Sequence, residues 1–144
     1  MSLEDAEVVL ARFRPWLYAA AVYNFVWGTS VILFPDWLFH LIRLSPPESP
    51  PFWQVVGMFV LVYAPAYAWA GRRPSAHAHI VMVGMLGKLL GPVGFLWALS
   101  VDELPLRFGL LLVTNDLIWW PSFVAYLYAA ARLHGGWRRF LLGD

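Results

Sequence analysis

Four long apolar segments constrain this sequence more than any other feature. They run from Pro15 to Phe34, Phe52 to Ala70, His79 to Leu99 and Leu106 to Ala130. Each is close to the ~20 residues that an α-helix needs to cross a hydrocarbon core of about 30 Å. The chain is therefore predicted to be a single all-α transmembrane domain, residues 1–144, with four membrane-spanning helices.

The composition agrees with a membrane protein and argues against several other classes. Of the 144 residues, 60% are hydrophobic and 13% are charged, which is unusual for a soluble domain of this length. A net charge of +1 gives no indication of nucleic-acid binding. The sequence contains no cysteine, so it excludes disulfides, thiolate metal ligands and thiol redox chemistry.

The connections between the segments predict how the helices pack. Segments 71–78 and 100–105 are short, and short links join antiparallel neighbours, so we expect an up-down-up-down four-helix bundle. The connection 35–51 contains five prolines and should form an irregular or partly helical cap. Residues 2–13 have the pattern of a short amphipathic helix on the membrane surface, with Ser2 and Asp5 resembling a capping box.

Arginines near the segment ends predict the orientation in the membrane. Two of them, Arg43 and Arg107, fall on one side, and seven fall on the other: Arg12, Arg14, Arg72, Arg73, Arg132, Arg138 and Arg139. Because positive charge stays on the cytoplasmic side, both termini should be cytoplasmic. Tryptophans near the segment ends predict an interfacial belt: Trp16, Trp37, Trp53, Trp69 and Trp97.

Polar residues collect near the predicted midplane of the bilayer. Lys88 is one residue from the centre of the third segment, and Asn115 and Asp116 lie two or three residues from the centre of the fourth. Asn24 and Tyr63 are central in the first two segments. A charge in hydrocarbon is costly unless it is paired, so we expect an ion pair between Lys88 and Asp116. Register fixing, ligand binding and proton transfer are all compatible with such a pair.

Three prolines indicate the same depth. A proline inside a helix removes the hydrogen bond to the carbonyl four residues earlier. The three prolines, Pro65, Pro92 and Pro121, should therefore leave three backbone carbonyls without a helical partner. These are the carbonyls of Leu61, Lys88 and Leu117. Free carbonyls in a bilayer need protein, water or a ligand as partner, which predicts a partly hydrated pocket in the bundle interior.

Glycines and tryptophans flank these polar residues. Gly84, Gly87, Gly91 and Gly94 share one side of the third segment, as is typical of close helix packing in membranes. If the fourth segment is one continuous helix, Asp116 shares a face with Trp119 and Trp120. Those indoles would then either wall a pocket for an apolar or aromatic ligand or pack in the core.

Several motifs carry a resemblance to a known group. They are YNFVWG (23–28), GKLLGPVGFLW (87–97), ELP (103–105) and NDLIWWPSF (115–123). On these motifs, residues 15–130 resemble a family of small bacterial four-helix integral membrane proteins, loosely DoxX-like. The resemblance implies a four-helix bundle in a bacterial inner membrane, but no reaction. NDLIWWP is also similar to the last span of the emopamil-binding sterol isomerase family, whose earlier acidic and histidine residues this sequence lacks.

Three functional hypotheses follow. The first is binding of a lipophilic small molecule, such as a quinone, isoprenoid or lipid, in a midplane pocket lined by Asn24, Tyr63, Lys88, Asn115, Asp116, Trp119 and Trp120. In it, Lys88 donates to a carbonyl or acidic group of the ligand. The second is a structural or accessory subunit of a membrane complex or homo-oligomer. The third is a membrane enzyme or proton-coupled carrier. No cofactor is evident, and His77 and His79 are not spaced as helical metal ligands.

Overall fold

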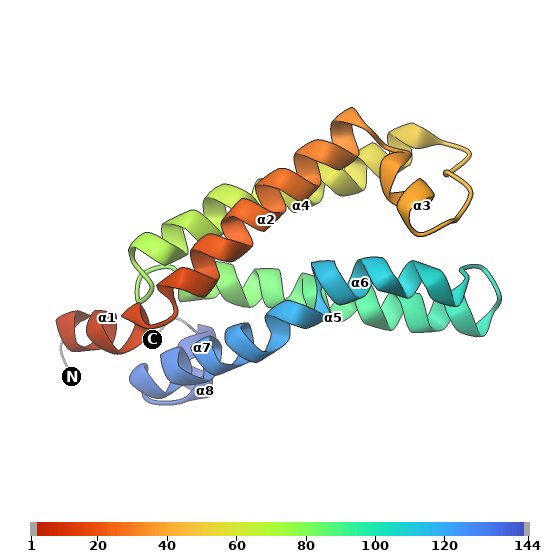
Figure 1. Ribbon diagram of the computed structural model, residues 1–144. Coiled ribbons are helices and arrows are strands. Elements are labelled where there is room, and N and C mark those ends of the chain that lie inside the picture. The colour runs from red at the N-terminus through yellow and green to blue at the C-terminus, as the bar shows by residue number, and fades with distance from the viewer. Residues whose placement is uncertain (1–2, 143–144) are drawn as a thin grey trace.

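The computed structural model describes residues 3–142, and its regular elements are all helices (Figure 1). In chain order they are α1 (Leu3–Ala11), α2 (Arg14–Leu33), α3 (Trp37–Leu41), α4 (Pro50–Arg72), α5 (Ala78–Ser100), η1 (Leu106–Phe108), α6 (Gly109–Asn115), η2 (Leu117–Trp119), α7 (Trp120–Leu133) and α8 (Trp137–Leu142). No β-strand occurs between residues 3 and 142. The prediction of an all-α helical bundle is confirmed.

Four helical segments are long and apolar enough to cross a membrane: Arg14–Leu33, Pro50–Arg72, Ala78–Ser100 and Leu106–Leu133. Every end lies within three residues of the boundary predicted from the sequence. The predicted cap between the first two spans is partly helical, because it contains α3. The short N-terminal helix is α1, although Ser2 of the expected capping box lies outside the described residues.

The spans form two helical hairpins. Helix α2 packs along α4, while α5 packs against α6 and α7. In Figure 1 the two hairpins lie close together at the end that carries α1 and α8, and they separate toward the end that carries α3. The larger of two buried cores, which includes Leu10, Tyr67, Tyr126 and Phe140, lies toward the end that carries α1 and α8.

Two glycines bring α2 and α4 into close contact. A Cβ atom added at Gly28 would lie 2.7 Å from the carbonyl oxygen of Gly57, and one added at Gly57 would lie 3.0 Å from the carbonyl oxygen of Gly28. Without side chains at these positions the two backbones approach directly, as small residues permit in membrane helices. This contact holds the first hairpin together.

The glycines of α5 do not form the uniform packing seam that the sequence suggested. Gly84 leaves room for the hydroxyl of Tyr67, and Gly91 leaves room for the carboxylate of Asp116. A Cβ atom added at Gly87 or Gly94 would meet nothing within 4 Å. Two of the four glycines thus accommodate polar groups of neighbouring helices, and the other two border open space.

Polar contacts close the end of the bundle that carries α1. The Glu7 carboxylate in α1 forms a 2.8 Å ion pair with Arg14 and accepts a 2.6 Å hydrogen bond from the Ser75 hydroxyl. The Tyr126 hydroxyl in α7 donates to the carbonyl of Pro74 in the same loop. These bonds tie α1 and α7 to the loop that joins the two hairpins.

The fourth span is not one continuous helix. It consists of α6, which ends at Asn115, a break at Asp116, the short turn η2, and α7. Pro121 lies in the first turn of α7, where no N–H is needed, so it does not free the Leu117 carbonyl inside a continuous helix. Leu106–Leu133 is still one candidate membrane span, but the expectation that it is one continuous helix, with one face shared by Asp116 and the two indoles, was wrong.

Candidate functional site

The break in the fourth span leaves backbone carbonyls at the end of α6 that two side chains satisfy. The Lys88 ammonium of α5 donates to the carbonyl oxygen of Asn115 at 2.5 Å. The Trp119 indole N–H turns back and donates to the carbonyl of Thr114 at 3.2 Å. Unpaired carbonyls are costly in hydrocarbon, so these donors are what allow the helix to end inside the membrane.

A reciprocal bond runs from the fourth span to the third. Pro92 lies inside α5 and, as the sequence predicts, leaves the Lys88 carbonyl without its helical partner. The indole N–H of Trp120 donates to that carbonyl at 3.1 Å. The side chain of Lys88 thus caps the fourth span, while Trp120 satisfies the backbone of Lys88.

Lys88 and Asp116 form the expected pair. The ammonium nitrogen lies 3.9 Å from Asp116 Oδ1, and the two residues are only 5% and 6% exposed. The ammonium lies closer to the Asn115 carbonyl oxygen than to Asp116. The carboxylate is therefore the more distant of the two partners of the ammonium. The ammonium also lies 6.0 Å from the centre of the Trp119 ring, at the outer limit of a cation–π contact.

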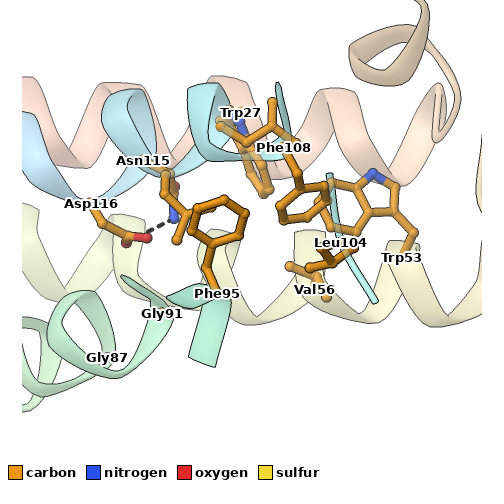
Figure 2. A pocket seen from close by; sticks show the side chains of 12 residues that line it. Trp27, Trp53, Val56, Gly87, Gly91, Phe95, Leu104, Phe108, Asn115 and Asp116 are labelled. Carbon is orange, nitrogen blue, oxygen red and sulfur yellow. Dashed lines mark hydrogen bonds between the residues drawn. The ribbon is translucent and has the colours of Figure 1, made fainter. Parts of the chain in front are cut away.

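Two adjoining cavities meet at Asn115 and Asp116. The larger, of about 340 Å³, lies between the hairpins and is lined by Trp27, Trp53, Val56, Gly87, Gly91, Phe95, Leu104, Phe108, Leu111, Leu112, Asn115 and Asp116 (Figure 2). The smaller, of about 240 Å³, shares Val56, Gly87, Asn115 and Asp116 with it and is also lined by Asn24, Phe59, Val60, Tyr63, Tyr67, Gly84 and Lys88. We call them the aromatic cavity and the polar cavity.

The aromatic cavity continues toward the α3 end of the bundle. A third cavity, of about 450 Å³, shares Trp53, Leu104 and Phe108 with it and also contacts Phe39, Leu44, Ser45, Pro47 and Pro105. Figure 2 shows Asp116 and Asn115 at one end of the aromatic cavity and Trp53 near the other. The three cavities therefore follow one another from the α3 end of the bundle to the buried polar residues.

The structure brings together five of the seven residues singled out in the sequence. Asn24, Tyr63, Lys88, Asn115 and Asp116 all line the polar cavity. The two tryptophans line neither the polar nor the aromatic cavity, and their indole N–H groups donate to the backbone carbonyls of Thr114 and Lys88. Trp119 is buried against Tyr23, with 5.4 Å between ring centres, and Trp120 borders a separate surface groove with Val124 and Tyr128.

The aromatic lining of the cavity is not evident from the sequence. Trp27, Phe95 and Phe108 are apolar residues in apolar segments, so nothing in the sequence separates them from residues that face lipid. Trp53 was expected in the interfacial belt, but it lies between Trp27 and Phe39, with ring centres 5.9 and 5.0 Å away. The neighbouring prolines, Pro50 and Pro51 at the start of α4, do not predict that the Trp53 ring packs among other aromatic rings.

Two asparagines that line the polar cavity each have an amide oxygen without a partner. The Asn24 amide nitrogen donates to the Val60 carbonyl at 3.2 Å, and the Asn115 amide nitrogen donates to Asp116 Oδ1 at 3.1 Å. Each bond fixes which way its amide points, because turning the amide over would place two oxygens against each other. The oxygen of each amide is buried and, among the described residues, has no hydrogen-bond partner.

The histidines lie away from this site. The rings of His79 and His134 are 6.4 Å apart, and Phe140 stacks on His79 with 4.5 Å between ring centres. No pattern in the sequence predicts the contact between His79 and His134. Within residues 3–142 no group of three histidine or acidic side chains is arranged to hold a metal ion.

Comparisons with known proteins add no relative to this description. No family model, curated protein or solved structure matches the chain. The functional argument therefore rests on the geometry of the site.

Proposed function

We propose that this protein binds a lipophilic small molecule between its two hairpins, with a polar group of the ligand at Asn115 and Asp116. The candidate classes are an isoprenoid, a quinone or a lipid. The observation that carries the proposal is the aromatic cavity of about 340 Å³, whose mostly apolar walls end at Asn115 and Asp116.

The composition of the walls of the aromatic cavity supports this proposal. Ligand sites in proteins are typically apolar concavities with a few convergent polar groups. A cavity of about 340 Å³ that ends at a carboxylate and an amide has this composition.

The placement of the arginines supports an orientation for the site. Arg12, Arg14, Arg72 and Arg73 lie near the end that carries α1, and Arg43 lies beyond α3 at the other end. By the positive-inside rule, we propose that the α1 end faces the cytoplasm of a bacterial inner membrane. The cavities would then extend toward the outer face of that membrane.

Two matched glycine substitutions in α5 test the proposal. Gly87 lines both cavities, and Gly94 is not among the residues that line either, while an added Cβ meets nothing within 4 Å at both positions. Leucine at Gly87 should fill the space that the ligand occupies, whereas leucine at Gly94 should not. We expect native mass spectrometry of protein extracted in a mild detergent to show a bound small molecule on the wild type and on Gly94→Leu, but not on Gly87→Leu.

Thermal unfolding of Gly87→Leu and Gly94→Leu provides the control, because it shows whether either substitution destabilises the fold. Both changes replace a glycine inside the same helix, and each should raise helix propensity to a similar degree. A bound mass that is the same in Gly87→Leu and the wild type would overturn the proposed site. The absence of any specifically bound small molecule on the wild type would overturn the proposed function.

A further inference from the structure

A pocket that contains two arginines lies where the second span ends and the third begins. It has a volume of about 240 Å³ and is lined by four residues: Trp69, Arg72, Arg73 and His77. The spans Pro50–Arg72 and Ala78–Ser100 are joined here, at the end of the molecule that carries α1 (Figure 1). The pocket therefore lies at the depth where the spans leave the membrane, and we call it the basic pocket.

The end of α4 and the turn after it bring the lining residues together. Trp69, Arg72 and Arg73 are spaced by three and four residues, so they share one side of the helix end. The backbone N–H groups of Ala76 and His77 both donate to the carbonyl of Arg73, which turns the chain back beside that end. The sequence separation of His77 from the others is thus closed by a tight turn.

Contacts with two other helices hold this loop in place. The Ser75 hydroxyl donates to the Glu7 carboxylate of α1 at 2.6 Å. The carbonyl of Pro74 accepts a hydrogen bond from the Tyr126 hydroxyl of α7. The backbone of the basic pocket is therefore fixed independently of the side chains that line it.

The charge of the two arginines is not balanced by a carboxylate. No acidic residue lines the basic pocket. Glu7, on the neighbouring helix, is paired with Arg14, and within residues 3–142 neither Arg72 nor Arg73 forms an ion pair. Guanidinium groups match the geometry of phosphate oxygens, to which they can donate two hydrogen bonds at once. The pocket therefore suits a phosphate group.

An exposed apolar stripe leads from the basic pocket along α4. Met58, Val62 and Trp69 are all exposed, and steps of four and seven residues place them on one side of the helix, in line with Arg73. Along a membrane-spanning helix such a stripe contacts acyl chains. A phospholipid fits the pocket and the stripe together, whereas a free phosphate would occupy the pocket alone.

We propose that the basic pocket binds the phosphate group of an anionic phospholipid, whose acyl chains lie along Met58 and Val62 of α4. Arg72 and Arg73 donate to the phosphate oxygens, and the Trp69 ring lies at the level of the head group, where tryptophan is favoured. Basic pockets between transmembrane helices commonly bind phospholipid head groups. The site is separate from the cavities between the hairpins, so this inference does not depend on the proposed function.

Two phospholipids that differ only in the head group test the inference. Phosphatidylglycerol and phosphatidylcholine with the same acyl chains are added to the full-length protein in a mild detergent, and native mass spectrometry measures the bound lipid. We expect the wild type to retain one phosphatidylglycerol at least about tenfold more tightly than phosphatidylcholine, since each arginine near an anionic lipid contributes about fivefold. The double variant Arg72→Gln/Arg73→Gln should lose this preference.

A second double variant is the matched control. Arg138→Gln/Arg139→Gln also removes two adjacent arginines, from α8, which lies at the same end of the molecule as the basic pocket but does not line it. Both variants lower the net charge by the same amount. The control should keep the preference of the wild type for phosphatidylglycerol.

Three outcomes would overturn the inference. The first is equal binding of the two lipids by the wild type. The second is an equal loss of preference in both double variants, because the charge of this end would then act without the pocket. The third is displacement of the lipid by an equal concentration of glycerol phosphate, which would make a water-soluble phosphate the ligand.

Circular dichroism of each variant shows whether it folds. If Arg72→Gln/Arg73→Gln does not fold, the single variants Arg72→Gln and Arg73→Gln replace it. Each should reduce the preference for phosphatidylglycerol by at least about threefold, since the two contributions multiply. An unchanged preference in both single variants would contradict the proposed site.

Discussion

At the scale of single residues, Lys88 has two tasks that the sequence does not distinguish. Its charge lies near Asp116, and its ammonium caps the carbonyl of Asn115 where α6 ends. An ion pair alone could be replaced by two apolar residues at little cost, as is often true of buried pairs. The capped carbonyl has no such substitute, because it belongs to the backbone.

This difference predicts the order of stability among three variants. Lys88→Met leaves both a carboxylate and a carbonyl unpaired and should lower the free energy of unfolding by about 3–5 kcal/mol. Asp116→Asn should cost less, because a neutral amine at Lys88 still donates to the carbonyl. The double variant should remain destabilised by about 1–3 kcal/mol, which is the cost of one unsatisfied buried carbonyl.

Unfolding by denaturing detergent, followed by circular dichroism, measures these three values against the wild type. If the ion pair were the whole role of Lys88, the double variant would recover wild-type stability. That recovery would contradict the assignment of Lys88 as the cap of α6.

At the scale of elements, the sequence predicts the number and the ends of the spans but not the break in the fourth. The four apolar runs match the observed helices within three residues, because bilayer thickness sets their length. The break at Asn115 and Asp116 lies in an apolar run that reads as a helix, and Pro121 marks the start of α7 and not a kink within it. Its partners, Lys88 and Trp120, come from tertiary contacts that no local pattern reveals.

Helix α1 offers an element-scale prediction that involves pH. Burial raises the pKa of Glu7, but hydrogen bonds from Ser75 and Arg14 outweigh that effect, so the pKa lies below its ordinary value. A carboxyl whose pKa is lower in the folded state stabilises the fold above its unfolded pKa, and this contribution disappears as the pH falls through the folded pKa. The attachment of α1 should therefore weaken in acid, from about pH 4 downward.

Hydrogen–deuterium exchange of the α1 amides between pH 3 and pH 7 measures this attachment. In Glu7→Gln the α1 amides should exchange faster than in the wild type at neutral pH. After correction for the intrinsic pH dependence of exchange, acid should then speed their exchange less than it does in the wild type. Glu48→Gln is the matched control, because Glu48 is exposed and lies between α3 and α4, at the other end of the bundle. Equal protection in Glu7→Gln and the wild type would show that the carboxylate does not hold α1.

At the scale of the whole molecule, the two hairpins lie close together at the end that carries α1 and apart at the end that carries α3 (Figure 1). The closed end is filled by a core that includes Tyr67, Phe123 and Tyr126, and by the contacts of Glu7 with Arg14 and Ser75. The separated end contains the cavities that lead to Asn115 and Asp116. The sequence predicts the polar residues at mid-depth because charges are rare there, but not which aromatic residues face them.

This shape leads to the central claim, that a lipophile lies inside the bundle and not merely on its lipid-facing surface. Photolabelling in lipid nanodiscs with a long-chain alcohol that carries a diazirine in its tail tests this claim most directly. Phe95 and Phe108 line the aromatic cavity, whereas Val124 and Tyr128 line a separate surface groove, and peptide mapping distinguishes the two. The account predicts label on the peptides that contain Phe95 and Phe108, lost in Gly87→Leu and retained in Gly94→Leu. Label confined to the surface groove, or unchanged in Gly87→Leu, would contradict it.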